Sequence, residues 1–276
     1  MLTRPIPIPR TSEPLPIVGV GTWQTFDVAP AGPDLAPRKE VLRTLFEAGG
    51  KVIDSSPMYG RAEEVVGVLL KDMQALDKPF IATKVWTSGE AAGIRQMNDS
   101  AAKMQAPIDL MQVHNLVDWR THLKTLRAWK AQKKVRYIGI THYTVPGLDE
   151  LAAVIRAEPA IDFVQFAFSI NVRDAEARLL PLCAERGIAT LINQPFDSGD
   201  LFRKVRGKAL PAWAAEMECA SWGQVFLKYI LGHPAVTCVI PGTAKPEHMR
   251  DNIGAGLGRL PDAAERKRMA ELWDGL

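Results

Sequence analysis

The stretch KVIDSSPMYGRAEEVVGVLLKDM (51–73) contains the unit that decides the fold. It opens with a short apolar run, and its later part places four apolar side chains at helical spacing, Val65, Val66, Leu69 and Leu70. A strand that is followed closely by a helix is the repeating unit of folds in which helices cover a parallel sheet. The rest of the chain repeats this unit.

Eight short apolar runs of this kind occur along the chain, namely VGVGTW (18–23), KVIDSS (51–56), FIATKV (80–85), DLMQVHN (109–115), YIGITHY (137–143), FVQFAFSI (163–170), GIATLINQ (187–194) and VTCVIPGT (236–243). Most of them are continuous rather than alternating, which is typical of parallel strands buried on both faces. Helical patterns lie between them, in APRKEVLRTLFEAGG (36–50), AEEVVGVLLKDM (62–73), THLKTLRAWKAQKK (121–134), PGLDELAAVIRAE (146–158), AEARLLPLCAERG (175–187) and SWGQVFLKYILGH (221–233).

Eight strands in alternation with helices predict an α/β fold, a (β/α)8 barrel that spans residues 1–276 as one domain. The alternative is a doubly wound sheet, but VGVGTW lacks the GxGxxG fingerprint that follows the first strand of that fold. Residues 5–16 predict a short N-terminal hairpin, and PDAAERKRMAELWDGL (261–276) predicts a C-terminal helix. Residues 197–215 predict a long loop at the barrel mouth, where long loops are often functional.

The composition limits the classes of function. The chain has 276 residues, of which 47% are apolar and 24% charged, and its net charge of +3 gives no reason to expect nucleic acid as a partner. No run of about 18 apolar residues occurs, so no membrane span is expected. The three cysteines lie far apart and the histidines do not cluster, which argues against a disulfide framework and a metal site. The start, MLTRPIPIPR, lacks the apolar core of a secretory signal, so we expect a cytoplasmic protein.

Polar residues end three successive runs, at Asp54, Lys84 and His114. The carboxyl ends of barrel strands meet at one mouth, which is where active sites of this fold lie. Tyr59 follows Asp54 in the loop before the next helix. An ammonium group beside a phenol is expected to lower the phenol's pKa from about 10 toward neutrality, while a carboxylate partly compensates the buried cation. A phenol tuned in this way can donate a proton to a developing alkoxide.

Each of these four residues also has a purely structural interpretation. In that interpretation Asp54 caps a turn and Lys84 extends from a strand end to water. His114 is then a hydrogen-bonded core histidine, and Tyr59 packs with its hydroxyl in water. Their joint placement at consecutive strand ends favours a chemical role over four separate structural ones.

Six segments resemble the aldo/keto reductase family, in the family's order: GVGTWQ (19–24), IDSSPMYGRAEEVVG (53–67), IATKVW (81–86), DLMQVHN (109–115), YIGITHY (137–143) and VIPGTAKPEHMRDN (239–252). The most specific part is Asp54-x4-Tyr59 followed by Lys84 and His114. The resemblance implies transfer of a hydride from NADPH to a carbonyl carbon without a metal. It also implies that Tyr59 protonates the carbonyl oxygen, that Lys84 and Asp54 tune Tyr59, and that His114 orients the carbonyl.

The same resemblance implies a set of cofactor-binding residues: Thr22, Trp23, Asp54, Thr141, His142, Gln165, Asn193, Gln194, Pro195, Phe196, Ser198, Asp200, Gly242, Thr243, Lys245, His248, Asp251 and Asn252. Two of the departures from the family pattern concern the nicotinamide. Thr141-His142 stands where the family usually has the Ser-Asn that holds the nicotinamide carboxamide, with Gln165 at the family's Gln. INQPFDSG (192–199) stands where relatives read AYSPLGSG, so that Asn193 replaces the tyrosine that stacks on the nicotinamide.

Residues 242–252 resemble the family's adenosine phosphate site, where a helix N-terminus suits an anion. Gly242 and His248 stand where relatives have the Lys and Arg that bind the 2′-phosphate. Lys245 and Arg250 are close in sequence and can substitute for that pair. We therefore expect a modest preference for NADP(H), with NAD(H) also possible.

Trp23, Trp86 and Trp119 are expected to line an apolar pocket for a small-molecule carbonyl substrate, with broad acceptance of aldehydes and ketones. No obligate protein partner is evident in the sequence. Two other functions stay open. One is a dinucleotide-binding regulatory or sensor protein on the same fold with little turnover, and the other is a Schiff-base aldolase that uses Lys84.

Overall fold

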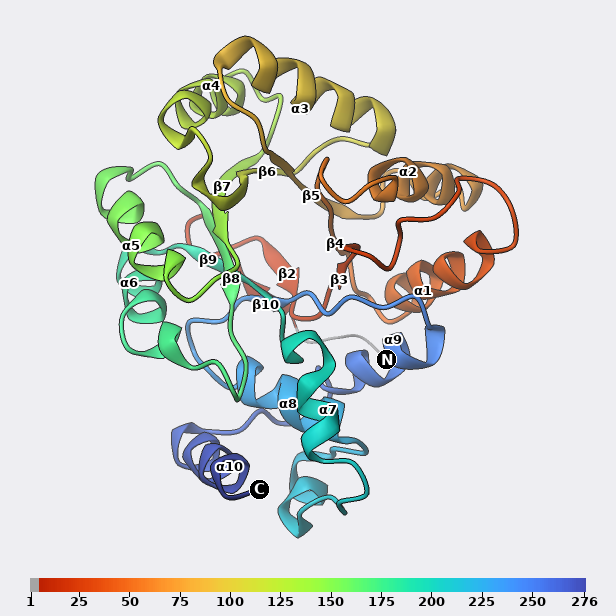
Figure 1. The fold of residues 1–276 in the computed structure, drawn as a ribbon, viewed down its shortest axis with the longest axis vertical. Helices are drawn as coiled ribbons and strands as arrows, with labels where there is room; N and C mark the ends of the chain where they lie inside the picture. Colours follow the sequence, from red (N-terminus) through yellow and green to blue (C-terminus); the bar gives the residue numbers. More distant parts are fainter. Residues whose placement is uncertain (1–4) are drawn as a thin grey trace.

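A computed structural model describes residues 5–276, in which eight parallel strands form a barrel surrounded by helices (Figure 1). Neighbouring strands follow chain order, and their bounds are β3 Val20–Gly21, β4 Val52–Asp54, β5 Phe80–Val85, β6 Leu110–Val113, β7 Tyr137–His142, β8 Phe163–Ala167, β9 Ala189–Asn193 and β10 Cys238–Val239. The barrel closes because Val18 bridges Val239 and Gly21 bridges Gly242, both in parallel. The predicted (β/α)8 barrel is confirmed.

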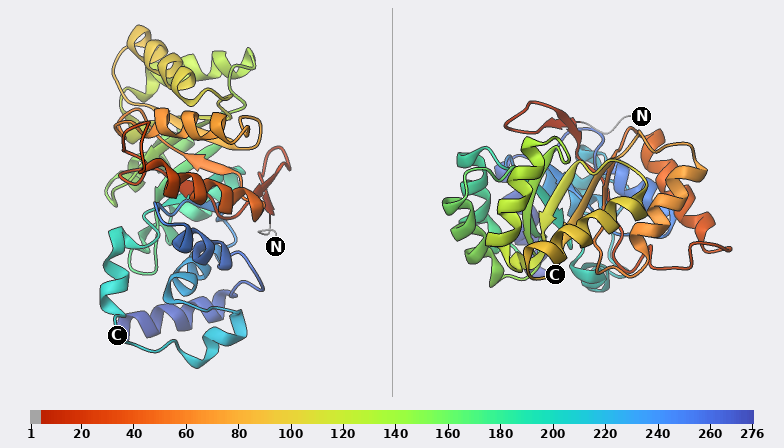
Figure 2. Two further views of the ribbon diagram at one scale, coloured as in Figure 1. Left: turned by 90° about the vertical axis from the view of Figure 1, so that its right-hand side faces the viewer. Right: turned by 90° about the horizontal axis from the view of Figure 1, so that it is seen from above.

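Helices form the outer ring of the barrel, as two further views show (Figure 2). Their bounds are α1 Leu35–Glu47, α2 Ala62–Asp72, α3 Glu90–Met104, α4 Trp119–Ala131, α5 Gly147–Ala157, α6 Leu179–Arg186, α7 Asp200–Lys204, α8 Trp222–Leu231, α9 Pro246–Gly254 and α10 Ala263–Gly275. Short 3-10 helices lie in the connections, at η1 His114–Leu116, η2 Asp174–Glu176, η3 Asp197–Gly199 and η4 Ala212–Met217. Helix α2 buries the four apolar side chains whose spacing predicted it, Val65, Val66, Leu69 and Leu70.

An antiparallel hairpin of β1 (Pro5–Pro7) and β2 (Pro14–Pro16) closes one end of the barrel, as the sequence predicted. Ile8 and Leu15 of this hairpin are buried in one cluster with the inward-facing side chains of the strands. Tyr137 at the start of β7 donates a hydrogen bond of 2.6 Å to the Glu13 carboxylate. The hairpin therefore covers the end where the strands begin, and the strands point their carboxyl ends toward the other end.

Three segments differ from what the sequence pattern predicts. Helix α3 was not predicted, because its buried face includes the small residues Gly93 and Ser100 and shows little apolar periodicity. The helix expected over residues 175–187 begins only at Leu179, since Pro181 is tolerated only in the first turn of a helix. Residues 197–215 are not one continuous loop, because η3, α7 and the start of η4 lie within them.

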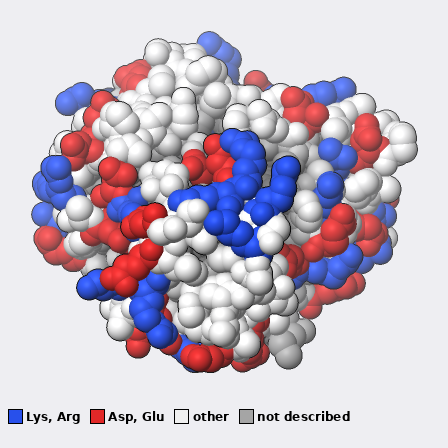
Figure 3. All heavy atoms as spheres, turned by 60° about the horizontal axis from the view of Figure 1, so that its bottom comes forward, with Lys and Arg blue, Asp and Glu red and all other residues white. Residues whose placement is uncertain are grey.

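The outer surface carries charges of both signs. Lys and Arg side chains gather near the centre of the face in Figure 3, and Asp and Glu side chains lie around them. Within residues 5–276 no helix is long and apolar enough to cross a membrane. The three cysteines are buried and free.

Candidate active site

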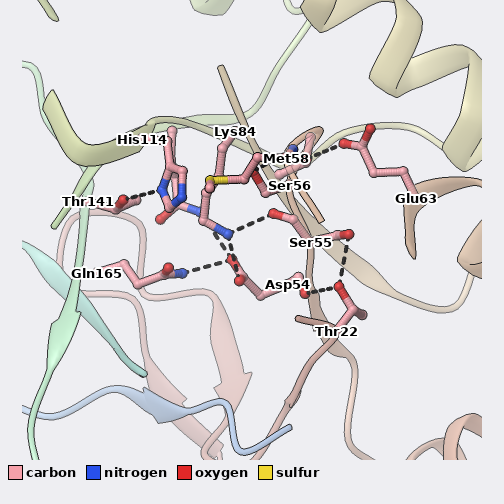
Figure 4. A network of polar contacts seen from close by, with 12 residues as sticks. Thr22, Asp54, Ser55, Ser56, Met58, Glu63, Lys84, His114, Thr141 and Gln165 are labelled. Carbon is pink, nitrogen blue, oxygen red and sulfur yellow. Dashed lines mark hydrogen bonds and ion pairs between the residues drawn. The ribbon is translucent and has the colours of Figure 1, made fainter. Parts of the chain in front are cut away.

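Inward-facing side chains at the carboxyl ends of the strands form a polar layer (Figure 4). Alternation along each strand turns every second residue toward the barrel axis. Lys84 pairs in register with Gln112, and Thr141 pairs with Gln165. The inward-facing residues nearer the hairpin are mostly apolar, among them Ala82, Leu110, Phe163, Ala189 and Leu191. The polar chemistry is thereby confined to the mouth of the barrel.

The Lys84 side chain is completely buried, and Asp54 compensates its charge. Lys84 Nζ donates hydrogen bonds of 2.7 Å to Asp54 Oδ2 and of 2.7 Å to the backbone carbonyl of Ser55. Asp54 Oδ1 accepts hydrogen bonds from Gln165 Nε2 at 2.7 Å and from Gln112 Nε2 at 3.3 Å. Burial lowers the pKa of Lys84, but Asp54 and the nearby Tyr59 outweigh burial, so this pKa lies above its ordinary value. Lys84 is therefore charged, and both oxygens of Asp54 are occupied by donors.

Tyr59 lies in the loop after β4, with its ring against the Lys84 ammonium group. Lys84 Nζ lies 4.9 Å from the centroid of the ring, and the His114 imidazole meets the ring edge-on at 6.1 Å between centroids. Burial raises the pKa of Tyr59 above its ordinary value, and the charge of Lys84 lowers it by less. The prediction that Lys84 brings this pKa toward neutrality is therefore wrong for the protein alone. A buried phenolate loses more hydration than one cation restores, so Tyr59 is protonated at neutral pH.

His114 is held in one orientation by Thr141. Its Nδ1 lies 2.8 Å from Thr141 Oγ1, and the same oxygen accepts a hydrogen bond of 3.3 Å from the backbone N–H of Asn115. Burial, the charge of Lys84 and the nearby His142 lower the pKa of His114 to about 3, so the imidazole is neutral. The Thr141 hydroxyl can donate its single proton to Nδ1, and in that arrangement the imidazole proton is on Nε2.

His142 and Asn193, which both depart from the family pattern near the nicotinamide, face in different directions. His142 follows Thr141 on β7 and so lies on the opposite face of that strand, where its Nδ1 accepts a hydrogen bond of 3.3 Å from the backbone N–H of Thr144. A Cβ on Gly147 would lie 2.0 Å from this nitrogen, so the ring packs on the first turn of α5. Asn193 ends β9 two residues after the inward-facing Leu191 and faces the barrel axis, with its Oδ1 buried and unpartnered in the described chain.

The loop after β9 has an unusual backbone. Gln194, Asp197 and Ser198 have φ of 48°, 50° and 54°, and Gly199 follows with φ of 94°. Non-glycine residues rarely adopt the left-handed region, and clusters of them concentrate at ligand-binding sites. Pro195 is buried, Phe196 is partly buried against the core, and Asp200 begins α7.

The segment at residues 242–252 leads from β10 into α9. Thr243 Oγ1 accepts a hydrogen bond of 3.0 Å from the backbone N–H of Lys245, which precedes Pro246 in the first turn of α9. Lys245, His248 and Arg250 are exposed, and none of the three forms an ion pair within residues 5–276. Two further residues face the protein instead. Asn252 is buried, and the Asp251 carboxylate accepts hydrogen bonds from Ser221 and Gln224 at 2.7 and 2.8 Å.

An apolar rim surrounds the mouth. The large apolar residues that are exposed in the described chain all lie in segments that follow a strand's carboxyl end: Trp23, Met58, Trp86, Tyr143, Val145 and Phe202. Trp23 is 50% exposed and follows Thr22, whose hydroxyl donates to the Asp54 carbonyl at 3.0 Å. Trp119 differs from the other two predicted pocket tryptophans. It is partly buried against the core, with the Arg120 guanidinium 4.2 Å from its ring centroid.

Comparison with known proteins agrees with this geometry. A sequence model of the aldo/keto reductase family matches residues 17–274. The chain belongs to this family. An aldo-keto reductase of Bacillus subtilis, YhdN, is 26% identical over 63% of this chain and 56% of its own length. The NADH-specific methylglyoxal reductase of Escherichia coli is 24% identical over 94% of this chain and 95% of its own length. A solved aldo-keto reductase of Klebsiella pneumoniae, in complex with NADPH, has 21% identity and a TM-score of 0.80, and covers 99% of this chain and 96% of its own.

The site of this aldo/keto reductase includes residues that the sequence did not single out. Gln112 donates to Asp54, and a polar residue inside the apolar run DLMQVHN, two positions before His114, was the available signal. Behind the site, on the outer side of β5, the buried Glu63 of α2 accepts hydrogen bonds from Thr83 and Ser100 at 2.6 and 3.0 Å. Gln96 of α3 holds the backbone of Trp86 at both its N–H and its carbonyl, at 2.6 and 3.2 Å. No group of side chains within residues 5–276 is arranged to hold a metal ion.

The buried Lys84–Asp54 pair yields a prediction about stability. Asp54→Asn leaves the Lys84 ammonium buried without its counter-charge, and breaking a buried pair from one side typically costs about 3–5 kcal/mol. Lys84→Met combined with Asp54→Asn removes both charges, so the double variant should be more stable than Asp54→Asn alone. Chemical denaturation at pH 7 measures the free energy of unfolding of the native protein, of Asp54→Asn, of Lys84→Met and of the double variant.

The exposed pair Lys39–Asp72 is the matched control for this experiment, because its side chains are 31% and 59% exposed. Asp72→Asn should change stability little, since water already screens both charges. Additive losses for Asp54→Asn and Lys84→Met would contradict the coupling of these two charges.

Proposed function

We propose that the protein is an NADP(H)-dependent reductase of aldehydes and ketones in which Tyr59 is the proton donor. The observation that carries the proposal is the placement of Tyr59 between a buried cation and a neutral imidazole at the barrel mouth. Lys84 Nζ lies 4.9 Å from the ring centroid of Tyr59, and the His114 ring lies edge-on to it. Membership of the aldo/keto reductase family over residues 17–274 supports the same assignment.

The bound dinucleotide would supply the hydride, and the side chains of the chain itself would manage the oxygen of the substrate. His114 carries its proton on Nε2 and donates a hydrogen bond that orients the carbonyl oxygen. Tyr59 is protonated at neutral pH and gives its proton to that oxygen as negative charge develops there. Lys84 stabilises the phenolate left behind, and Asp54 keeps the Lys84 ammonium charged inside the barrel.

The residues present fit a dinucleotide. Thr141, Gln165 and Asn193 offer polar side chains from three adjacent strands, and the buried Asn193 Oδ1 has no partner within the described chain. Lys245, His248 and Arg250 are exposed beside the start of α9 and are available to an anion such as a 2′-phosphate. The NADPH complex of the Klebsiella relative supports NADP(H), and the NADH-specific Escherichia coli relative keeps NAD(H) possible.

The apolar rim favours small carbonyl compounds with an apolar or aromatic body. Trp23 and Trp86 present exposed rings at the mouth, and Gln96 fixes the backbone of Trp86. The Arg120 guanidinium lies against Trp119, and Trp119 is partly buried, so it contributes less to this wall than the sequence suggested. We expect broad acceptance of aldehydes and ketones.

Two alternatives have weaker support. A sensor protein with little turnover needs no intact proton donor, yet Tyr59, Lys84, Asp54 and His114 all lie together here. A Schiff-base aldolase needs a neutral, reachable lysine amine. Lys84 is buried, donates two hydrogen bonds and has a raised pKa, all of which oppose nucleophilic attack.

The first prediction for this function concerns Tyr59→Phe. The variant lacks the proton donor, and general acid catalysis typically contributes about 10²–10⁴-fold, so kcat/KM for aldehyde reduction should fall by at least about 10²-fold. NADPH binding should persist, because the ring remains. Tyr137→Phe is the matched control, since it removes a hydroxyl at the hairpin end of the barrel and should leave kcat/KM unchanged. Activity of Tyr59→Phe within threefold of the native protein would exclude Tyr59 as the donor.

The pH profile of reduction follows from the two pKa values. Reduction needs protonated Tyr59, whose pKa is raised above its ordinary value of about 10, so kcat/KM should fall only above about pH 10. His114 has a pKa of about 3, so no acid limb should appear near its ordinary value of 6.5. Oxidation of an alcohol needs the phenolate and should accelerate as pH rises. Rates at saturating NADPH between pH 5 and 10 test this, and a midpoint between pH 6 and 8 would refute it.

Cofactor preference gives the next prediction. One charge-assisted hydrogen bond to a 2′-phosphate contributes roughly 1.5–3 kcal/mol, which corresponds to a preference for NADPH over NADH of about 10- to 100-fold. Lys245→Met should remove most of it by raising the KM for NADPH while the KM for NADH stays constant. Lys124→Met, which removes an exposed lysine on α4, is the control. Equal use of both dinucleotides by the native protein would show that no 2′-phosphate site exists.

A further inference from the structure

We propose that Asn193, and not His142, completes the site that holds the carboxamide of the nicotinamide ring. This inference rests on the proposed function, because it assigns a residue to the cofactor named there. It reverses the expectation from sequence order, in which His142 follows Thr141 as the second half of the carboxamide pair. Three observations carry it: the faces of the strands, the partners of His142 and the missing partner of Asn193.

Strand alternation separates the two residues. Thr141 and Gln165 pair in register on β7 and β8, and both face the barrel axis, where they bond His114 and Asp54. His142 is the next residue after Thr141, so it lies on the outer face of β7. Asn193 pairs in register with Ala167, which lies two residues beyond Gln165 on the same face of β8. Asn193 therefore faces the barrel axis like Thr141 and Gln165, and it lies two residues nearer the mouth than Leu191, which pairs with Gln165.

His142 already has its partners on the outer face. Its Nδ1 accepts from the Thr144 backbone N–H at 3.3 Å and lies 3.2 Å from the Thr144 hydroxyl. Gly147 at the start of α5 leaves the space that the ring fills, since a Cβ there would lie 2.0 Å from Nδ1. The Tyr143 ring stacks near it, with 6.0 Å between centroids. Turning His142 inward would break these contacts.

Unlike His142, Asn193 has a side-chain oxygen that lacks a hydrogen-bond partner in the described chain. This Oδ1 is buried, and a buried oxygen in that state is unfavourable because it has lost its hydrogen bonds to water. A carboxamide offers two N–H donors and one carbonyl acceptor, which match an asparagine amide. A ligand N–H that reached Oδ1 would remove the cost of the unpartnered oxygen and would fix the rotation of the nicotinamide ring. Asn193 replaces a stacking tyrosine of the family, so the lost stacking area is exchanged for a directed hydrogen bond.

The test compares ligands that carry or lack the nicotinamide. Asn193→Leu keeps the side-chain volume and removes the amide, and binding of NADPH and of 2′,5′-ADP to the full chain is measured by calorimetry. We expect the Kd for NADPH to rise about 10-fold, which is the equivalent of one hydrogen bond, while the Kd for 2′,5′-ADP stays within twofold. The thermal midpoint of the ligand-free variant should not fall, because the substitution removes an unpartnered polar group. The stabilisation by NADPH should shrink.

His142→Ala, which changes the outer face at the end of β7, provides the comparison. The proposal is overturned if Asn193→Leu binds NADPH like the native protein, or if His142→Ala loses NADPH affinity selectively while Asn193→Leu does not. It is also overturned if both ligands weaken equally in Asn193→Leu, because the residue is then structural. A native protein that binds neither NADPH nor 2′,5′-ADP would instead refute the proposed function itself.

Discussion

The structure of the site depends on the burial of one charge, the Lys84 ammonium at the mouth of the barrel. An ammonium group without exposure to water must be compensated by the protein, since removing it from water costs several kcal/mol. Asp54 and the carbonyl of Ser55 compensate it from β4 and the residue after it, and amides from β6 and β8 hold the second carboxylate oxygen. Four strands must therefore keep their register for the pair to form, which ties the site to the closed barrel.

The barrel can hold this buried ion pair because polar and apolar layers are separated along its axis. The inward-facing residues of β5 pass from apolar to polar along the barrel axis: Phe80 and Ala82 pack in the interior cluster, and Lys84, two residues further, joins the polar layer. The hairpin side chains Ile8 and Leu15 complete the apolar end. A rigid interior of this kind lets the loops at the other end vary without disturbing the buried pair, and the exposed apolar residues are found in those loops.

Much of this arrangement could be predicted from the sequence because it depends on local patterns. Apolar runs identified the eight strands, and the residues that end them identified Asp54, Lys84 and His114. What could not be predicted depends on contacts between distant segments. The direction of His142 is set by Gly147 and Thr144, the packing of Trp119 by the core and Arg120, and the face of α3 by small residues. The pKa of Tyr59 depends on how deeply the fold buries it, which spacing in the sequence does not reveal.

The raised pKa of Tyr59 agrees with the direction of chemistry that the rest of the site favours. A phenol that stays protonated at neutral pH is a ready donor, and in the proposed reaction the oxygen that would receive its proton becomes far more basic than a phenolate as the carbonyl is reduced. The neutral imidazole of His114 adds a hydrogen bond without adding a competing acid, because its pKa is about 3. In the proposed reduction, Lys84 would act at the moment the phenolate forms, when a buried cation 4.9 Å from the ring centroid is most stabilising. Burial thus keeps Tyr59 protonated before the proposed reaction, and the charge of Lys84 would stabilise the phenolate that proton release leaves behind.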